Sequence, residues 1–174
     1  CKSMYDILIV NGCVITVDEK HTIHAPGYVA VKGDTIAAVG PMGELDPLPE
    51  AGRVIDAAGH AVLPGMIDAH GHGGHCLLKN IGEGRGDSWG DMAEDIYYHY
   101  TDEFFWMAEG ALAAAERVKF GITTGVSMIG STPRMDDIWP VRANLEGSGK
   151  VGIRQMSGIG VASGVWPKVS RTYT

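Results

Sequence analysis

Val62–His75, "VLPGMIDAHGHGGH", is the most informative stretch of the sequence, because a short apolar strand there runs into a Gly-rich loop with three of the chain's seven histidines. Side chains at positions i and i+2 of a strand lie on one face, about 6.6 Å apart. His70 and His72 can therefore converge on one metal ion, with only Gly71 between them. At the C-terminal end of a parallel strand, this pair would lie where α/β proteins build their active sites.

Upstream of this stretch, the sequence is typical of β-strands separated by turns. "YDILIVNGCVITVD" gives two β-rich runs around Asn11-Gly12, a dipeptide that favours a tight hairpin turn. A second hairpin is expected around Lys32-Gly33-Asp34, and two more short strands are expected within residues 44–65. We therefore predict a small antiparallel β unit as the first domain, over residues 1–62.

Downstream of Val62 the pattern alternates between strand and helix. The elements expected after the first strand are a helix within 101–121, a strand over 122–130, a short helix within 137–149 and a third strand within 151–164. Thr101 is the expected N-cap of the first helix, and Gly121 the residue that ends it. This order predicts the start of a parallel α/β arrangement over residues 63–174. A closed (β/α)8 barrel needs about 250 residues. This region is therefore either an unusual small α/β domain or a fold that another polypeptide completes.

Composition narrows the class of ligand. With 21 acidic and 14 basic residues, a formal net charge of −7 and no basic run, the chain is not expected to bind nucleic acid, and a small-molecule substrate fits better. No stretch approaches the roughly 20 apolar residues of a membrane span, and the N-terminus lacks the pattern of a secretion signal. We therefore expect a cytoplasmic protein without a membrane partner. Three widely spaced cysteines argue against a disulfide framework, and Cys76 is more often a small buried residue than a metal ligand.

The run "VIDAAGHAVLPGMIDAHGHGGHCLLK", with "DILIVNGCVITVD" and "VAVKGDTIAAVG" before it, resembles the N-terminal portion of the metal-dependent amidohydrolase superfamily. It is most similar to the branch that contains cytosine, S-adenosylhomocysteine and guanine deaminases and the triazine hydrolases. "GITT" at residues 121–124 adds a weaker match. The resemblance implies a small β-sandwich segment over residues 1–62, followed by an incomplete (β/α)8 TIM-type barrel start over residues 63–174.

For the site, the resemblance implies that His70 and His72 bind one catalytic divalent metal. Zinc is the expected ion, with iron or manganese as alternatives, because imidazole ligands suit several transition metals. The family's further histidines, its metal-binding aspartate and its acid/base residue lie on later strands, outside these residues. We therefore expect a complementary C-terminal amidohydrolase chain as partner, in a higher oligomer.

Three nearby residues are further candidates for the site. His75 stands where the triazine-hydrolase branch carries a residue close to the substrate, so it is either a substrate contact or proton relay, or a loop residue that faces solvent. Asp68 is expected to share the strand face of the histidine pair, and orienting the loop is the favoured role over metal binding. Trp89, in a Gly-rich loop, is a candidate lid or pocket residue. The aromatic run "YYHYTDEFFWM" is either an apolar helix face or a wall for a planar substrate.

The resemblance implies a hydrolase that breaks a C–N bond in an amide, amidine, carbamate or aminated heterocycle. A metal-activated water would attack the electrophilic carbon, and an acid/base residue from the complementary chain would protonate the leaving group. The alternative is a non-catalytic binding or assembly subunit that retains a vestigial metal site. A third possibility is a fragment of one longer protein, which leaves the enzymatic assignment intact.

Overall fold

A computed structural model describes residues 4–129 and 138–159 of the chain, which has a mixed α/β fold. The chain divides into two compact units, residues 1–64 and 65–174, and each is described by itself. Three expected elements include residues outside the described ones: the strand over 122–130 at residue 130, the helix within 137–149 at residue 137, and the strand within 151–164 at residues 160–164.

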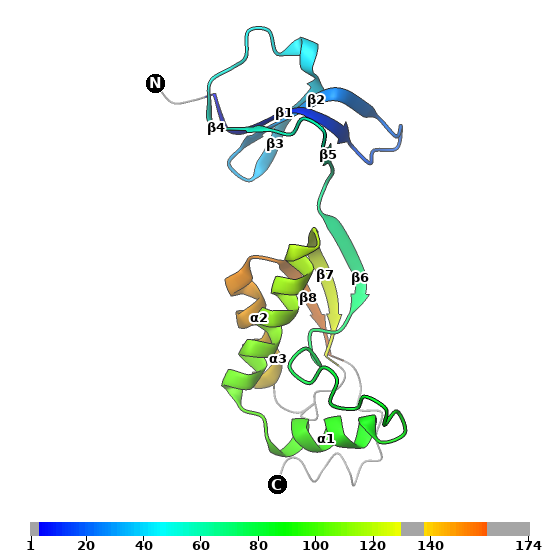
Figure 1. Ribbon diagram of the computed structural model, residues 1–174. Coiled ribbons are helices and arrows are strands. Elements are labelled where there is room, and N and C mark those ends of the chain that lie inside the picture. The colour runs from blue at the N-terminus through cyan, green and yellow to red at the C-terminus, as the bar shows by residue number, and fades with distance from the viewer. Residues whose placement is uncertain (1–3, 130–137, 160–174) are drawn as a thin grey trace. The chain divides into compact units, whose positions relative to one another are not determined.

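The first unit is one five-stranded sheet (Figure 1). Its elements are β1 (Tyr5–Ile15), β2 (Ile23–Lys32), β3 (Thr35–Pro41), the short 3-10 helix η1 (Met42–Glu44), β4 (Ala51–Asp56) and β5 (Ala61–Val62). The strand order is β3-β2-β1-β4, with β5 also pairing β1. The three longest strands pair antiparallel as expected, but β4 and β5 run parallel to β1, so the prediction of a purely antiparallel unit is wrong. Leu8, Val10, Tyr28 and Ala30 form the core of this unit.

One of the two expected hairpin turns is absent. Lys32 ends β2 and Thr35 begins β3, so the turn around Gly33 is confirmed. In contrast, β1 continues through Asn11-Gly12, where the register against β2 shifts and Asn11 has a φ of 61°. The positive φ that suits a turn here serves a β-bulge instead, because β2 continues to pair with β1 on both sides of the irregularity.

The second unit is a parallel sheet with a helix layer. Its elements are β6 (Met66–Gly71), α1 (Trp89–His99), α2 (Glu103–Lys119), β7 (Ile122–Met128), α3 (Trp139–Val151) and β8 (Arg154–Gly158). The strands are parallel in the order β6-β7-β8, which confirms the expected alternation of strand and helix. In Figure 1, α2 and α3 lie together on one side of the sheet, and α1 lies beyond the C-terminal ends of the strands. No helix within the described residues is long and apolar enough to cross a membrane.

Helix α1 and the start of α2 differ from the sequence-based expectation. The region that begins α1 was expected to be a loop, because glycines precede Trp89. Asp102, not Thr101, is the N-cap of α2, and its carboxylate accepts a hydrogen bond from the backbone N–H of Phe105. Thr101 instead donates to the carbonyl of Tyr97 and accepts from the Trp106 indole, which joins α1 to α2.

Candidate metal centre and its supporting network

A β-bulge near the end of β6 determines where the histidines point. Asp68 lies opposite Gly125 of β7, and Gly71 lies opposite Ser127. Three steps along β6 therefore match two steps along β7, which places one extra residue in β6. A bulge of this kind reverses the alternation of side chains that follow it, since the side-chain period of a strand is two.

The bulge places His70 and His72 on the side of the sheet opposite to Asp68. Gly71 shares the side of Asp68, because a Cβ at Gly71 would meet the Arg117 guanidinium and the Asp68 carboxylate. His70 and His72 flank Gly71 and so face the other way. The expectation that Asp68 shares the face of the pair is therefore wrong. Both imidazoles are exposed, and their ring centroids are 5.4 Å apart with the planes at 87°.

On the helix side of the sheet, Asp68 is held by charge and by hydrogen bonds. Arg117 of α2 donates from Nε to Asp68 Oδ2 at 3.1 Å, and its side chain is only 11% exposed. Asp68 Oδ1 accepts a hydrogen bond from the backbone N–H of His70 at 3.3 Å. The Arg117 guanidinium also donates to Gln155 Oε1 of β8 at 3.4 Å. Asp68 thus orients the backbone that carries His70, the role favoured for it from the sequence.

Asn144 of α3 extends this network beneath the next loop residues. Its fully buried side chain donates from Nδ2 to the carbonyl of Gly73 at 2.8 Å and accepts from Gln155 Nε2 at 3.3 Å. A Cβ at Gly73 would lie 2.6 Å from the Ser127 hydroxyl, so only glycine fits at this approach. Among the described residues, that buried hydroxyl has no hydrogen-bond partner. The polar network therefore packs directly against the backbone of the histidine segment.

His75 is fixed by a second set of contacts. Its backbone has a φ of 67°, and its N–H donates to the phenol oxygen of Tyr97 at 2.8 Å. The same oxygen lies 2.9 Å from His75 Nδ1 and donates to Glu109 Oε1 at 3.1 Å. Glu109 Oε2 accepts from the backbone N–H of Leu77 at 2.6 Å. Burial, and next the charge on His72, lower the pKa of His75.

Two of the supporting groups are ionisable and buried. Burial raises the pKa of the Glu109 carboxyl, against the effect of the hydrogen bonds it accepts from Leu77 and Tyr97. Burial, and next the charge of Glu109, raise the pKa of Tyr97, which keeps its phenol proton. Neither was singled out from the sequence, although Tyr97 lies in the aromatic run and Glu109 is an acidic residue in an otherwise apolar helical stretch.

Trp89 lies next to His75. It is the first residue of α1, its ring centroid is 5.1 Å from that of His75, and it remains 39% exposed. Tyr97 and Trp106 continue the row of rings behind His75, stacked with centroids 5.1 Å apart. The aromatic run thus has both a core part, at Tyr97 and Trp106, and an exposed neighbour at Trp89.

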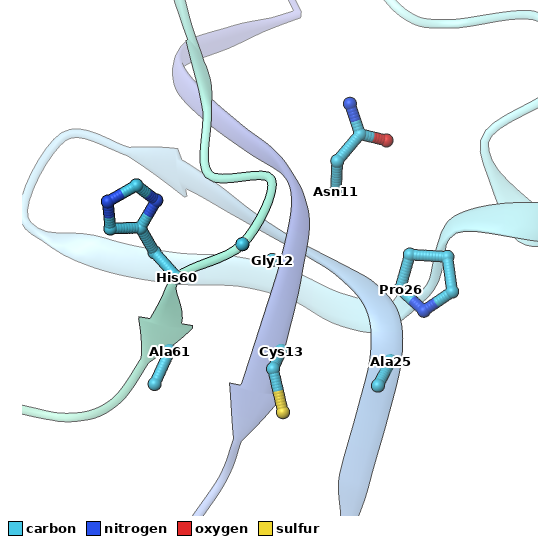
Figure 2. Close-up of a pocket in the computed structure, with 8 residues that line it drawn as sticks. Asn11, Gly12, Cys13, Ala25, Pro26, His60 and Ala61 are labelled. Atoms are coloured by element: carbon cyan, nitrogen blue, oxygen red, sulfur yellow. The ribbon is translucent and has the colours of Figure 1, made fainter.

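Cys76 directly follows His75 in the chain. Cys76 is half-buried, and burial raises the pKa of its thiol, which suits a neutral packed side chain. His60 of the first unit borders a shallow pocket together with Cys13 and Asn11 (Figure 2). His60 Nδ1 lies 3.0 Å from the carbonyl of Ala58. Within residues 4–129 and 138–159, no group of three or more His, Cys, Asp or Glu side chains is arranged to hold a metal.

The donor chemistry of His70 and His72 nevertheless suits a transition metal. Two imidazoles on one open side of the sheet, with small glycines between and after them, would supply half of the ligands of a four-coordinate zinc site. The backbone beneath them is held by Asp68 and Asn144, as expected where outer groups orient the ligands. Further ligands would have to come from outside the described residues.

No family model matches the chain. The chain is 34% identical over 134 residues to a 5-methylthioadenosine/S-adenosylhomocysteine deaminase of Syntrophobacter fumaroxidans. The aligned region covers 72% of this chain and 29% of that deaminase. An adenosine deaminase from Xanthomonas campestris, solved with bound zinc, has a TM-score of 0.74 at 20% identity, over 87% of this chain and 33% of that one. A triazine hydrolase from Arthrobacter aurescens has a TM-score of 0.67 at 24% identity, over 88% and 35%. The chain thus spans about a third of the length of the proteins it matches.

A parallel sheet with a helix layer on one side and a histidine pair at the end of its first strand is a structure of the barrel-type α/β class. Within that class, the chain belongs to the metal-dependent amidohydrolase superfamily, and it is similar to the N-terminal part of the deaminase and triazine-hydrolase branch.

Proposed function

We propose that this chain supplies two metal ligands, His70 and His72, to the active site of a hydrolase that breaks C–N bonds. The observation that carries the proposal is the bulge in β6, which turns both imidazoles to the open side of the sheet while the helix side holds their backbone. Zinc is the proposed ion, and the zinc named with the adenosine deaminase neighbour supports it. A bound divalent ion supplies Lewis acidity to such a reaction.

The proposed substrate is a small molecule with an aminated heterocycle, amide, amidine or carbamate group. The names of the similar proteins, which include adenosine-type deaminases and a triazine hydrolase, support this range. His75 and Trp89 are proposed to contact the substrate, with His75 in addition able to relay a proton. The ring of His75 lies 6.2 Å from that of His72, and the ring of Trp89 lies 5.1 Å from that of His75.

The remaining metal ligands and the acid/base residue are proposed to lie outside residues 1–174, in a complementary chain or in a longer form of this polypeptide. Two observations support this. Two imidazoles are fewer ligands than a zinc site uses, and the chain matches only 29% and 36% of two deaminase relatives.

The metal content of variants tests the proposal. In the assembled protein, His70→Ala and His72→Ala are each expected to remove stoichiometric zinc, measured by elemental analysis, and to abolish hydrolysis of an aminated heterocycle such as adenosine or a triazine. His99→Ala, an exposed histidine of α1, is the matched control and should keep both. Full metal content and activity in both variants would show that the pair is not the metal site. A protein that holds no metal even as wild type would favour a non-catalytic subunit.

Native mass spectrometry of the purified particle, followed by denaturation, tests the complement. A second chain of about 250 to 300 residues would match the remainder of a barrel enzyme. A particle that contains only 18.5 kDa chains and still hydrolyses substrate would refute the proposed complement.

A further inference from the structure

We propose that Tyr97 and Glu109 are positioning residues that fix His75 as the neutral tautomer with its proton on Nδ1, so that Nε2 is the nitrogen that can accept a proton or a hydrogen bond. The inference extends the proposed function, because it assigns a chemical form to the histidine placed beside the metal pair. It concerns atoms that the proposed metal site does not include, and it can be tested without metal.

The number of protons around the Tyr97 oxygen leads to this assignment. Three groups lie within hydrogen-bond distance of it: the backbone N–H of His75 at 2.8 Å, His75 Nδ1 at 2.9 Å and Glu109 Oε1 at 3.1 Å. A phenol has one proton to donate and can accept at its lone pairs. The backbone N–H can only donate, so it uses one lone pair. The phenol proton is then available to either Glu109 or Nδ1, but not to both.

Glu109 takes the phenol proton when it is ionised. A carboxylate can only accept hydrogen bonds, and donors reach both of its oxygens: Leu77 N–H at Oε2 and Tyr97 at Oε1. Hydrogen bonds to an ionised carboxylate are among the stronger ones in proteins. With the phenol proton directed to Glu109, Nδ1 of His75 must be the donor to the phenol oxygen. A neutral imidazole with its proton on Nδ1 carries none on Nε2.

Burial and ring stacking hold the side chains of Tyr97 and Glu109 in one conformation. Glu109 is fully buried, Tyr97 is 2% exposed, and the Tyr97 ring stacks on Trp106 at an interplanar angle of 26°. Glu109 and Tyr97 come from α2 and α1, so two helices hold one loop residue. The left-handed backbone of His75, which is unfavourable for a non-glycine residue, is compensated by these bonds. A side chain that only faced solvent would not need such a set of partners.

Nitrogen NMR of the histidine side chains tests the assignment directly. In the ¹⁵N-histidine-labelled 174-residue chain at pH 8 with a chelator, two-bond ¹H–¹⁵N correlations distinguish the two tautomers. His75, identified by the signals lost in His75→Gln, should be predominantly Nδ1–H. Tyr97→Phe, which keeps the ring stack and removes the hydroxyl, should shift His75 to a majority of Nε2–H, the form a free histidine side chain prefers. Tyr100→Phe, at an exposed tyrosine one residue beyond α1, is the matched control and should leave His75 unchanged.

Glu109→Gln gives a second test, in which the same tautomer shift is expected while the Tyr97 hydroxyl is retained. The amide oxygen must accept from Leu77 N–H, so its NH₂ group faces Tyr97 and donates to the phenol oxygen. The phenol then donates to Nδ1, and His75 should become predominantly Nε2–H with the hydroxyl still present. An Nε2–H majority in the wild type, or an Nδ1–H majority retained in Tyr97→Phe, overturns the proposal. Loss of zinc binding with the expected tautomers would refute the proposed function alone.

Discussion

The two sides of the histidine segment at the end of β6 differ sharply in how they are occupied. On the helix side, Asp68, Gly71 and Gly73 face a packed polar network from α2, α3 and β8. On the other side, His70 and His72 are exposed, and so is Ile67, at 71%. On the helix side, a methyl group at Gly71 would overlap the Arg117 guanidinium and the Asp68 carboxylate, whereas on the open side both imidazoles are exposed. A rigid backbone beneath open ligands is what a preorganised metal site needs.

The largest effect on the packed helix side is expected from a substitution that forces helices α2 and α3 apart. Gly147 of α3 approaches α2 so closely that an added Cβ would overlap the carbonyl oxygen of Met107 and lie 2.9 Å from the backbone nitrogen of Ala111. Backbone atoms cannot rotate away, so Gly147→Ala should destabilise the second unit by about 3 kcal/mol. Urea unfolding monitored by tryptophan fluorescence measures this loss.

Gly149→Ala in the same helix is the matched control. Gly149 is exposed, and a Cβ there would meet no atom within 4 Å. Because alanine favours the helix more than glycine does, this variant should gain about 0.5–1 kcal/mol. If both variants change stability in the same direction, the close approach of α2 and α3 is not the constraint described here.

The order of elements and the histidine pair could be predicted from the sequence because both depend on local pattern. An apolar run that ends in His70-Gly71-His72 identifies a strand and two donors without knowledge of its neighbours. The bulge could not be predicted, because it exists only in the pairing of Asp68 and Gly71 with β7. Strict alternation of side chains along β6 predicts Asp68 on the same face as the histidines. The extra residue of the bulge puts Asp68 on the opposite face.

The other features that the sequence did not predict also depend on contacts between segments that are distant in the sequence. Asn11 adopts the positive φ that its dipeptide favours, yet whether this produces a turn or a bulge depends on where β2 pairs. Glu109 and Tyr97 lie twelve residues apart on different helices, and their contact with His75 arises from the packing of α1 against α2. A buried glutamate in an alanine-rich helix signals that a partner exists but does not say which one.

Removing Arg117 tests the polar network on the helix side of β6 by itself, because this change does not force the helices apart. Arg117→Met keeps most of the apolar stem and leaves the Asp68 carboxylate, 24% exposed, without its cation. We expect a loss of about 2 kcal/mol in unfolding free energy. Zinc affinity of the assembled protein should fall roughly tenfold, since Asp68 orients the backbone of His70. Urea unfolding and competition with a chromogenic chelator measure the two effects.

Lys150→Met is the control for this prediction, because Lys150 pairs with Glu146 in an exposed i,i+4 ion pair. It should cost about 0.5 kcal/mol or less and leave zinc affinity unchanged. Equal losses of affinity in both variants would mean that the net charge, and not the position of Arg117 beneath the histidines, governs the site.

The smallest expected effect concerns pH and the contacts behind His75. Burial raises the pKa of Glu109 above its ordinary value of 4.5, so the folded state keeps this proton at pH values where the unfolded chain has lost it. The contribution of Glu109 to stability is therefore fully present below about pH 4.5 and is lost as pH rises through the folded pKa. Glu109→Gln cannot titrate, and the other carboxyls are common to both proteins. The stability of the wild type relative to Glu109→Gln, from urea unfolding between pH 4.5 and 8, should decrease as pH rises. A difference that grows with pH would mean that the hydrogen bonds from Leu77 and Tyr97 outweigh burial at this carboxyl.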